Sequence, residues 1–197
     1  SKFFYDPSFV RPQWADGKFV VGSFGKFEYR KGQDIVIEAF RRFSEGKPDV
    51  VLAYNWFNLW PDTAKMFVHS PYMSIEAKKY LGGALAIDAA LICGGVKQSS
   101  THVFPFIYHS DKSYADMYRC CNVTLFPNRK EAGTNLPLME SIACGVPPVT
   151  VGSHGHGDVT GLLDTVRSAQ YTFENAGVEI GTYYEANVDD LVDKLNW

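Results

Sequence analysis

The stretch "NRKEAGTNLPLMESIACGVPPV", residues 128–149, follows the apolar run "NVTLFP" and decides the fold. Asn135 can cap a helix whose first turn is "LPLME", because a proline is tolerated where the early helical N–H groups lack partners. Gly145, followed by two prolines, then ends that helix. The stretch predicts a buried strand, a loop that carries Glu131, a helix that carries Glu140, and a further strand.

The same alternation extends outward from this stretch. Segments of helical period lie at 33–46, 74–95, 111–121 and 136–145, and the segment 74–95 is weakened as a helix by a Gly-Gly pair. Apolar runs with β-branched or aromatic character lie between them, at 18–24, 49–56, 102–108, 122–127 and 146–151. The tail 178–197 indicates one more strand and a final helix. The order predicts an α/β fold, a doubly wound and mostly parallel sheet with helices on both faces.

Composition limits the domain count and the partners. The 197 residues are 46% hydrophobic and 21% charged, which is typical of one globular domain. We expect residues 1–17 to form an N-terminal extension or an inter-domain connection and residues 18–197 to form the domain. The net charge of −3 provides no chain-wide basic field, so nucleic acid is not an expected partner.

The sequence also favours a cytoplasmic location. No apolar run approaches the roughly 20 residues that span a bilayer, and the start "SKFFYDPSF" lacks the regions of a signal peptide. The four cysteines form no C-x-x-C pair and lie in or beside apolar segments, as buried thiols do in a reducing compartment. Membrane association would then require another domain.

The loop "GSFGKFEYRKGQD", residues 22–34, suits a phosphate group. Its glycines, among them Gly25 and Gly32, permit positive φ and close backbone approach, and the next helix offers unpaired N–H groups. Lys26 and Lys31 add two ammonium groups. The loop is neither a Walker loop nor a G-x-G-x-x-G turn. Alternatively, it is an ordinary connection with solvated lysines.

Two carboxylates frame the second loop. Glu140 lies on the apolar face of its helix, one turn after Leu136, where a carboxylate without a partner is costly to bury. Paired sugar hydroxyls are suitable partners, because an ionised carboxylate accepts two hydrogen bonds side by side. Glu131 precedes "AGTN", whose small residues leave backbone amides free to meet a ligand, although a solvated loop carboxylate fits the same pattern.

Together these loops resemble the nucleotide-sugar-binding half of a retaining glycosyltransferase with the GT-B architecture. This large group includes sucrose and glycogen synthases and bacterial lipopolysaccharide and mannosyl transferases. "FGKFEYRKGQDIVIEAF" looks like the family's G-R-x4-K-G-x-D loop with Lys26 in place of the arginine. "FPNRKEAGTNLPLMESIACGVPPV" looks like its paired-glutamate motif, with eight residues between Glu131 and Glu140 where the usual motif has seven. The resemblance covers about residues 18–195.

The resemblance implies a role for each matching residue. Lys26 and Lys31 would neutralise the donor diphosphate, and Gly25, just before Lys26, would also contact the donor. Glu140 would hold the ribose hydroxyls. Ile107 would contact the nucleobase. Glu131 would meet the donor sugar together with the following residues, namely Ala132, Gly133, Thr134, Asn135 and Leu136.

The implied activity is retaining transfer of a hexosyl group in glycan biosynthesis. The donor would be a nucleoside-diphosphate sugar, and the acceptor a glycan, lipid or protein held by an N-terminal domain that this chain lacks. Lys26, Lys31 and Glu131 would be the catalytic residues. Fixed cations stabilise the negative charge that grows on the leaving diphosphate, so no metal or cofactor is expected. The chain alone would be incomplete for catalysis.

Other interpretations remain open. A binding module of the same fold could hold a nucleotide sugar for assembly or regulation, and an epimerase of the same architecture is a third class. The loop "SHGHGD", residues 153–158, is either a neutral loop, a contact to donor phosphate or sugar, or a metal site. Trp56 and Trp60 could stack on a sugar or pack in the core.

Overall fold

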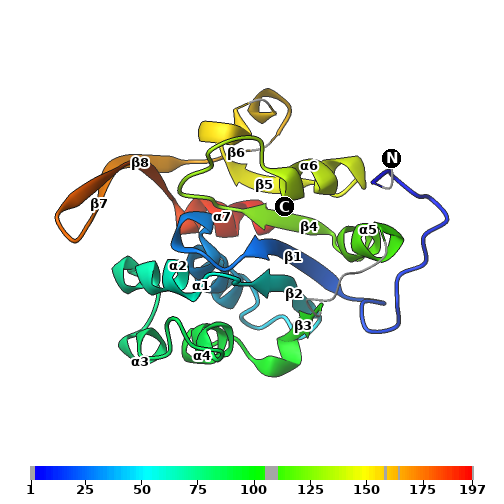
Figure 1. The fold of residues 1–197 in the computed structure, drawn as a ribbon. Helices are drawn as coiled ribbons and strands as arrows, with labels where there is room; N and C mark the ends of the chain where they lie inside the picture. Colours follow the sequence, from blue (N-terminus) through cyan, green and yellow to red (C-terminus); the bar gives the residue numbers. More distant parts are fainter. Residues whose placement is uncertain (1–2, 105–110, 158, 164, 197) are drawn as a thin grey trace.

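The computed structural model describes residues 3–104, 111–157, 159–163 and 165–196. A parallel six-stranded sheet lies at its centre, in the order β3-β2-β1-β4-β5-β6 (Figure 1). The chain builds outward from β1 to β3 and then crosses to the other side of β1, so the strand order reverses between β1 and β4. Such a reversal places a crevice at the carboxyl ends of these two strands. The strands are β1 (Phe19–Lys26), β2 (Val50–Phe57), β3 (Thr101–Val103), β4 (Val123–Phe126), β5 (Pro148–Val151) and β6 (Thr165–Val166).

Helices cover both faces of the sheet. Side chains alternate between the faces along β1: Val21 joins the core under α1 (Gln33–Phe43), α4 (Ala86–Cys93) and α7 (Val188–Leu195). Val20 and Phe24 join a second core with α5 (Asp111–Arg119), which contacts α6 (Leu136–Ala143). The predicted doubly wound α/β fold is thereby confirmed.

Shorter helical segments lie in the connections. They are α2 (Pro61–Lys65), α3 (Ile75–Lys78) and the 3-10 turns η1 (Tyr29–Lys31), η2 (Met66–His69), η3 (Gln98–Ser100), η4 (His154–His156) and η5 (Thr160–Leu162). The predicted helix 74–95 is thus two helices, α3 and α4. The chain breaks between them because Gly82 has a φ of +83° and cannot continue a helix.

A separate hairpin follows the sheet. β7 (Ser168–Asn175) pairs antiparallel with β8 (Val178–Ala186), and the pair projects from the body of the molecule (Figure 1). The turn residues Ala176 and Gly177 both have positive φ, as a tight two-residue hairpin requires. The predicted strand near 178 exists, but its partner is β7, which we did not predict, and it does not belong to the central sheet.

All four cysteines are free thiols, and Cys120, Cys121 and Cys144 are buried, as expected. None of the helices in the described part of the chain is long and apolar enough to cross a membrane.

Candidate functional site

The loops after β1 and β4 touch at the carboxyl edge of the sheet. The Lys130 N–H donates to the Arg30 carbonyl at 3.2 Å. Gly32 lies so close to the second loop that a Cβ on it would be 2.4 Å from the Pro127 carbonyl oxygen, and its φ is +75°. Glycine is therefore required here twice, by backbone conformation and by space. The two loops that the sequence singled out therefore lie side by side.

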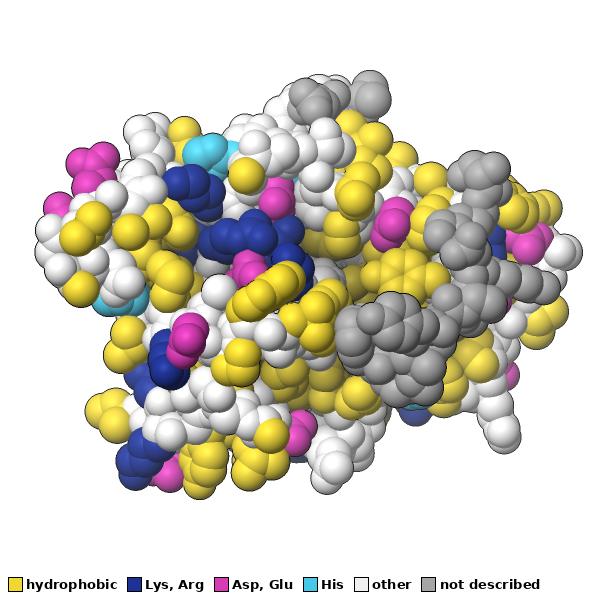
Figure 2. Space-filling view, in the orientation of Figure 1, with side chains coloured by type: hydrophobic (Ala, Val, Ile, Leu, Met, Phe, Trp, Pro, Cys, Tyr) yellow, Lys and Arg dark blue, Asp and Glu magenta, His cyan; other side chains and the backbone are white. Residues whose placement is uncertain are grey.

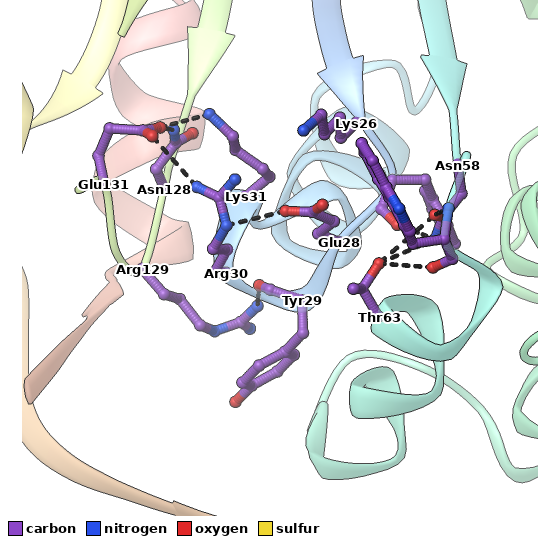
Figure 3. Close-up of polar contacts among 12 residues, drawn as sticks. Lys26, Glu28, Tyr29, Arg30, Lys31, Asn58, Thr63, Asn128, Arg129 and Glu131 are labelled. Carbon is purple, nitrogen blue, oxygen red and sulfur yellow. Dashed lines mark hydrogen bonds and ion pairs between the residues drawn. The ribbon is translucent and has the colours of Figure 1, made fainter. Parts of the chain in front are cut away.

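Basic and acidic side chains meet between these loops (Figures 2 and 3). Lys31 and Arg30 both contact the Glu131 carboxylate, the Arg30 Nη1 at 3.1 Å. Asn128 donates to Glu131 Oε2 at 2.8 Å, and Arg30 Nε lies 2.8 Å from Glu28 Oε2. Glu131 is therefore held by three donors and is not a solvated loop carboxylate. Arg30 is a cation of the site that the sequence analysis missed, although it stands next to Lys31.

The environment shifts the protonation of this pair. Burial would raise the pKa of Glu131, but the Lys31 and Arg30 charges outweigh burial, so the pKa lies below its ordinary value. Burial lowers the pKa of Lys31, and the Glu131 carboxylate opposes that shift. Glu131 is thus stabilised as a carboxylate that neutralises two neighbouring cations.

Lys26 occupies the end of β1 (Figure 3). Its ammonium lies 4.4 Å from the centre of the exposed Trp60 ring, a cation–π distance. The preceding Gly25 has a φ of +117°. Trp56, in contrast, is buried and donates its indole N–H to Ser23 at 3.1 Å, so it is a packing residue.

Arg129 fixes the backbone immediately before Glu131. Its side chain is fully buried and donates to both oxygens of Asp34 at 2.8 and 2.7 Å, to both oxygens of Glu185 at 2.6 and 2.9 Å, and to the Tyr29 carbonyl at 2.8 Å. All five guanidinium N–H groups therefore have acceptors. Asp34, the aspartate of the "KGQD" segment, serves as a partner of this arginine. No sequence pattern pointed to Arg129, because its carboxylate partners come from α1 and β8.

Glu140 projects from α6 toward α5. The Tyr118 hydroxyl donates to Glu140 Oε2 at 2.6 Å. Burial, together with the Glu140 charge, raises the pKa of Tyr118 well above its ordinary value, so the phenol remains a donor. The protein itself thus provides a partner for Glu140, which the sequence analysis assigned to sugar hydroxyls, and this bond orients the carboxylate.

In the loop that follows Glu131, the residues before Asn135 are exposed, whereas Asn135 itself is buried. Ala132, Gly133 and Thr134 are exposed, and Leu136 beyond them is 66% exposed. Asn135 is buried and stands at the N-cap position of α6, but its side chain makes no capping bond. The expectation that it caps the helix is wrong, because its amide instead lies 2.9 Å from His156 Nε2. Ile107, the expected base contact, lies outside the described residues.

The loop after β5 separates its two histidines. His156 is completely buried, and its Nδ1 lies 2.6 Å from Thr150 Oγ1. Burial lowers the pKa of this imidazole. His154 is exposed and packs edge-on against Tyr184, with ring centres 4.8 Å apart. No group of three or more His, Cys, Asp or Glu side chains within the described ranges could hold a metal ion.

Comparisons with known proteins found similarity in structure. Neither a family model nor a curated protein matches the sequence. The C-terminal domain of a group 1 glycosyl transferase (LpcC) from Francisella tularensis superposes with a TM-score of 0.64 and 20% identity, covering 99% of this chain and 84% of that domain. The catalytic domain of cholesterol-alpha-glucosyltransferase from Helicobacter pylori gives 0.53 and 17%, with coverages of 91% and 85%.

Anabaena HepE in complex with UDP-glucose gives a TM-score of 0.52 and 17% identity. The match covers 74% of this chain and 33% of HepE, so the chain corresponds to about a third of that protein. These superpositions establish a common fold. The chain therefore has the α/β fold of the C-terminal domain of a group 1 glycosyl transferase and of related GT-B enzymes.

Proposed function

We propose that this chain binds the nucleoside-diphosphate sugar donor of a retaining glycosyltransferase. One observation carries the proposal: Arg30 pairs with Glu28 and Glu131, and Lys31 pairs with Glu131, where the loops after β1 and β4 meet at the switch point of the sheet. This is the place where open α/β sheets bind ligands. Lys26 stands at the end of β1, where the first of these loops begins. The HepE complex with UDP-glucose, on the same fold, supports a donor of this class.

The residues present can supply the electrostatics of such a reaction. As the glycosidic bond breaks, negative charge grows on the leaving diphosphate, and fixed cations stabilise that charge more in the transition state than in the ground state. Lys26, Arg30 and Lys31 would serve this purpose. Glu131 would face the donor sugar, and Glu140, oriented by Tyr118, would hold the ribose.

A calorimetric screen tests the proposal directly. The chain is titrated with UDP, GDP and ADP, and with UDP-glucose, GDP-mannose and ADP-glucose. Binding of one nucleotide and its sugar supports the proposal and identifies the base. If none of the six ligands binds, the proposal is wrong.

Glu140→Ala is expected to weaken the best nucleotide by about 1.5–3 kcal/mol, the usual effect of losing hydrogen bonds to a charged group. The control is Glu76→Ala, which removes an exposed carboxylate paired with Lys79 on α3. Calorimetry compares both variants with the wild type. Equal affinity of wild type and Glu140→Ala would remove Glu140 from the site.

Lys31→Ala is expected to reduce both the affinity for the diphosphate and its dependence on salt. Partly exposed charges are screened over about 8–10 Å, so a diphosphate gripped by lysines should bind more weakly as ionic strength rises. Lys79→Ala, which removes an exposed lysine, is the matched control. An affinity that does not change with salt would indicate that the lysines do not grip the diphosphate.

Glu131→Gln is expected to have opposite effects on the two kinds of ligand. In the present arrangement Glu131 neutralises Lys31 and Arg30, so a diphosphate has to compete with it. Removing its charge should tighten binding of the bare nucleoside diphosphate, because no carboxylate at position 131 then neutralises Lys31 and Arg30. The nucleotide sugar should gain less, because its contact to Glu131 is altered. Unchanged binding of both would show that the diphosphate does not approach these cations.

A further inference from the structure

Three buried polar side chains form a chain behind the exposed loop 132–134. Thr150 at the end of β5 and His156 in η4 are completely buried, and Asn135, at the start of α6, is 2% exposed. Thr150 Oγ1 lies 2.6 Å from His156 Nδ1, and His156 Nε2 lies 2.9 Å from the Asn135 amide nitrogen, so two hydrogen bonds link the three side chains. These three residues are distinct from the cations Lys26, Arg30 and Lys31. The proposed function assigns no role to Thr150 or His156.

The surrounding acceptors fix where each proton lies. The Thr150 hydroxyl donates to the Phe126 carbonyl at 3.0 Å, so toward His156 it acts as an acceptor. The Val151 carbonyl, 3.1 Å from the same ring nitrogen, can only accept. His156 Nδ1 therefore carries the hydrogen, and Nε2 of the neutral ring is an acceptor.

This tautomer sets the orientation of Asn135. Since Nε2 accepts, the Asn135 side chain must present its NH₂ group to His156, and its carbonyl oxygen then points away from the ring. That oxygen, Oδ1, is buried and has no hydrogen-bond partner among the described residues. The histidine thus holds an unused acceptor at the start of α6, and it prevents the amide from capping the first N–H groups of that helix.

The backbone of the same two loops is in close contact. A Cβ added to Gly155 would lie 1.6 Å from the Gly133 carbonyl oxygen and 3.2 Å from Glu131 Cγ. No side chain fits between the loops, so the position of residue 155 determines that of residue 133. The loop after β5 therefore supports loop 131–136 in two ways, through the hydrogen bond from His156 to Asn135 and through the backbone contact of Gly155.

We propose that His156 is a positioning residue that sets selectivity for the nucleotide sugar over the bare nucleoside diphosphate. It acts by holding Asn135 and the backbone of residues 132–134 in the arrangement that faces the donor sugar. The ligand class is the sugar of a nucleoside-diphosphate sugar, which would meet the exposed residues 132–134. This role rests on the proposed function, because loop 131–136 is the part of the site assigned to the sugar.

The test compares two identical substitutions two positions apart. His156→Asn removes the ring that bridges Thr150 and Asn135, whereas His154→Asn changes an exposed residue whose φ of +54° asparagine tolerates. Affinities are measured for UDP with UDP-glucose, GDP with GDP-mannose, or ADP with ADP-glucose, whichever pair binds the wild type. His156→Asn should weaken the nucleotide sugar about tenfold, as expected for one lost hydrogen bond, and the bare diphosphate much less. His154→Asn should change neither.

A second variant and a spectrum keep the test decisive if His156→Asn folds poorly. Gly155→Ala forces the two loops apart and should cause the same selective loss. In the wild type, ¹⁵N–¹H correlation spectra of His156 should show a proton on Nδ1 and none on Nε2. An Nε2–H tautomer, or an equal loss for diphosphate and sugar in the folded variants, overturns the positioning role alone. If the wild type binds none of the ligands, the proposed function fails and this inference fails with it.

Discussion

Replacing Arg129 with leucine is expected to lower the free energy of unfolding by about 3–5 kcal/mol, the effect of removing one member of a buried ion pair. The guanidinium is fully buried between Asp34, whose side chain is 1% exposed, and Glu185. The substitution leaves the Asp34 carboxylate without its bidentate partner and removes one of the donors to the Tyr29 carbonyl. Chemical denaturation of wild type and variant measures the difference.

Arg41→Leu is the matched control for this prediction. Arg41 pairs with Glu38 on the same helix as Asp34, but its side chain is 41% exposed. Such a pair contributes about 0.2–1 kcal/mol. Arg129→Lys should fall between the two, because an ammonium cannot bind two carboxylates in the planar bidentate manner. If Arg129→Leu and Arg41→Leu lose the same stability, the buried network is not what holds these loops together.

Donor binding without useful sugar transfer is the second large effect that we expect from this chain. Alignment of two reactants can supply about 7–11 kcal/mol of the reduction in barrier. The residues of the proposed site address the diphosphate, the ribose and the donor sugar, and we assign none of the described residues to an acceptor. Open to water on the acceptor side, the site would also lose part of the electrostatic strength that a closed cleft gives to Lys26 and Lys31.

The measurement follows released diphosphate and glycosylated product, with the best-binding nucleotide sugar and candidate glycan, lipid and protein acceptors. Slow donor hydrolysis that does not depend on acceptor is the expected result, and Lys31→Ala should reduce it further. The H. pylori structure, of which this chain covers 85%, is described as a catalytic domain, which makes the outcome informative. Robust acceptor-dependent turnover would show that no further domain is needed.

The sequence predicted the parts of the fold that depend on local pattern. The helical period of its apolar residues predicted α1, and runs of β-branched and aromatic residues predicted the buried strands β1, β2 and β4. All four elements are present in the structure. The loops "FEYRKG" and "KEAGTN", residues 27–32 and 130–135, were correctly predicted to lie at one edge of the sheet. Their meeting follows from topology, since both come after neighbouring parallel strands.

The sequence did not predict which residues would be partners. Tyr118 to Glu140, His156 to Asn135 and Arg129 to Asp34 are separated by 22, 21 and 95 positions, and each depends on tertiary packing. Asn135 shows the difference most clearly. Its residue type and place favour a helix cap, but its NH₂ group bonds to the buried His156 and its oxygen makes no capping bond.

The β7–β8 hairpin has a consequence for how the site moves. Its own pairing is local and is closed by a two-residue turn. Its attachment to the body runs through the packing of Tyr183 and Phe173 against Tyr29, and through two contacts to Arg129: the Tyr184 N–H donates to its carbonyl, and its guanidinium pairs with Glu185. Such a unit can detach while the central sheet stays folded. Amide hydrogens at this attachment should therefore exchange with solvent faster than those between β1 and β2. A ligand bound at the neighbouring edge would slow that exchange without contacting the hairpin, so the hairpin would report on occupancy of the site.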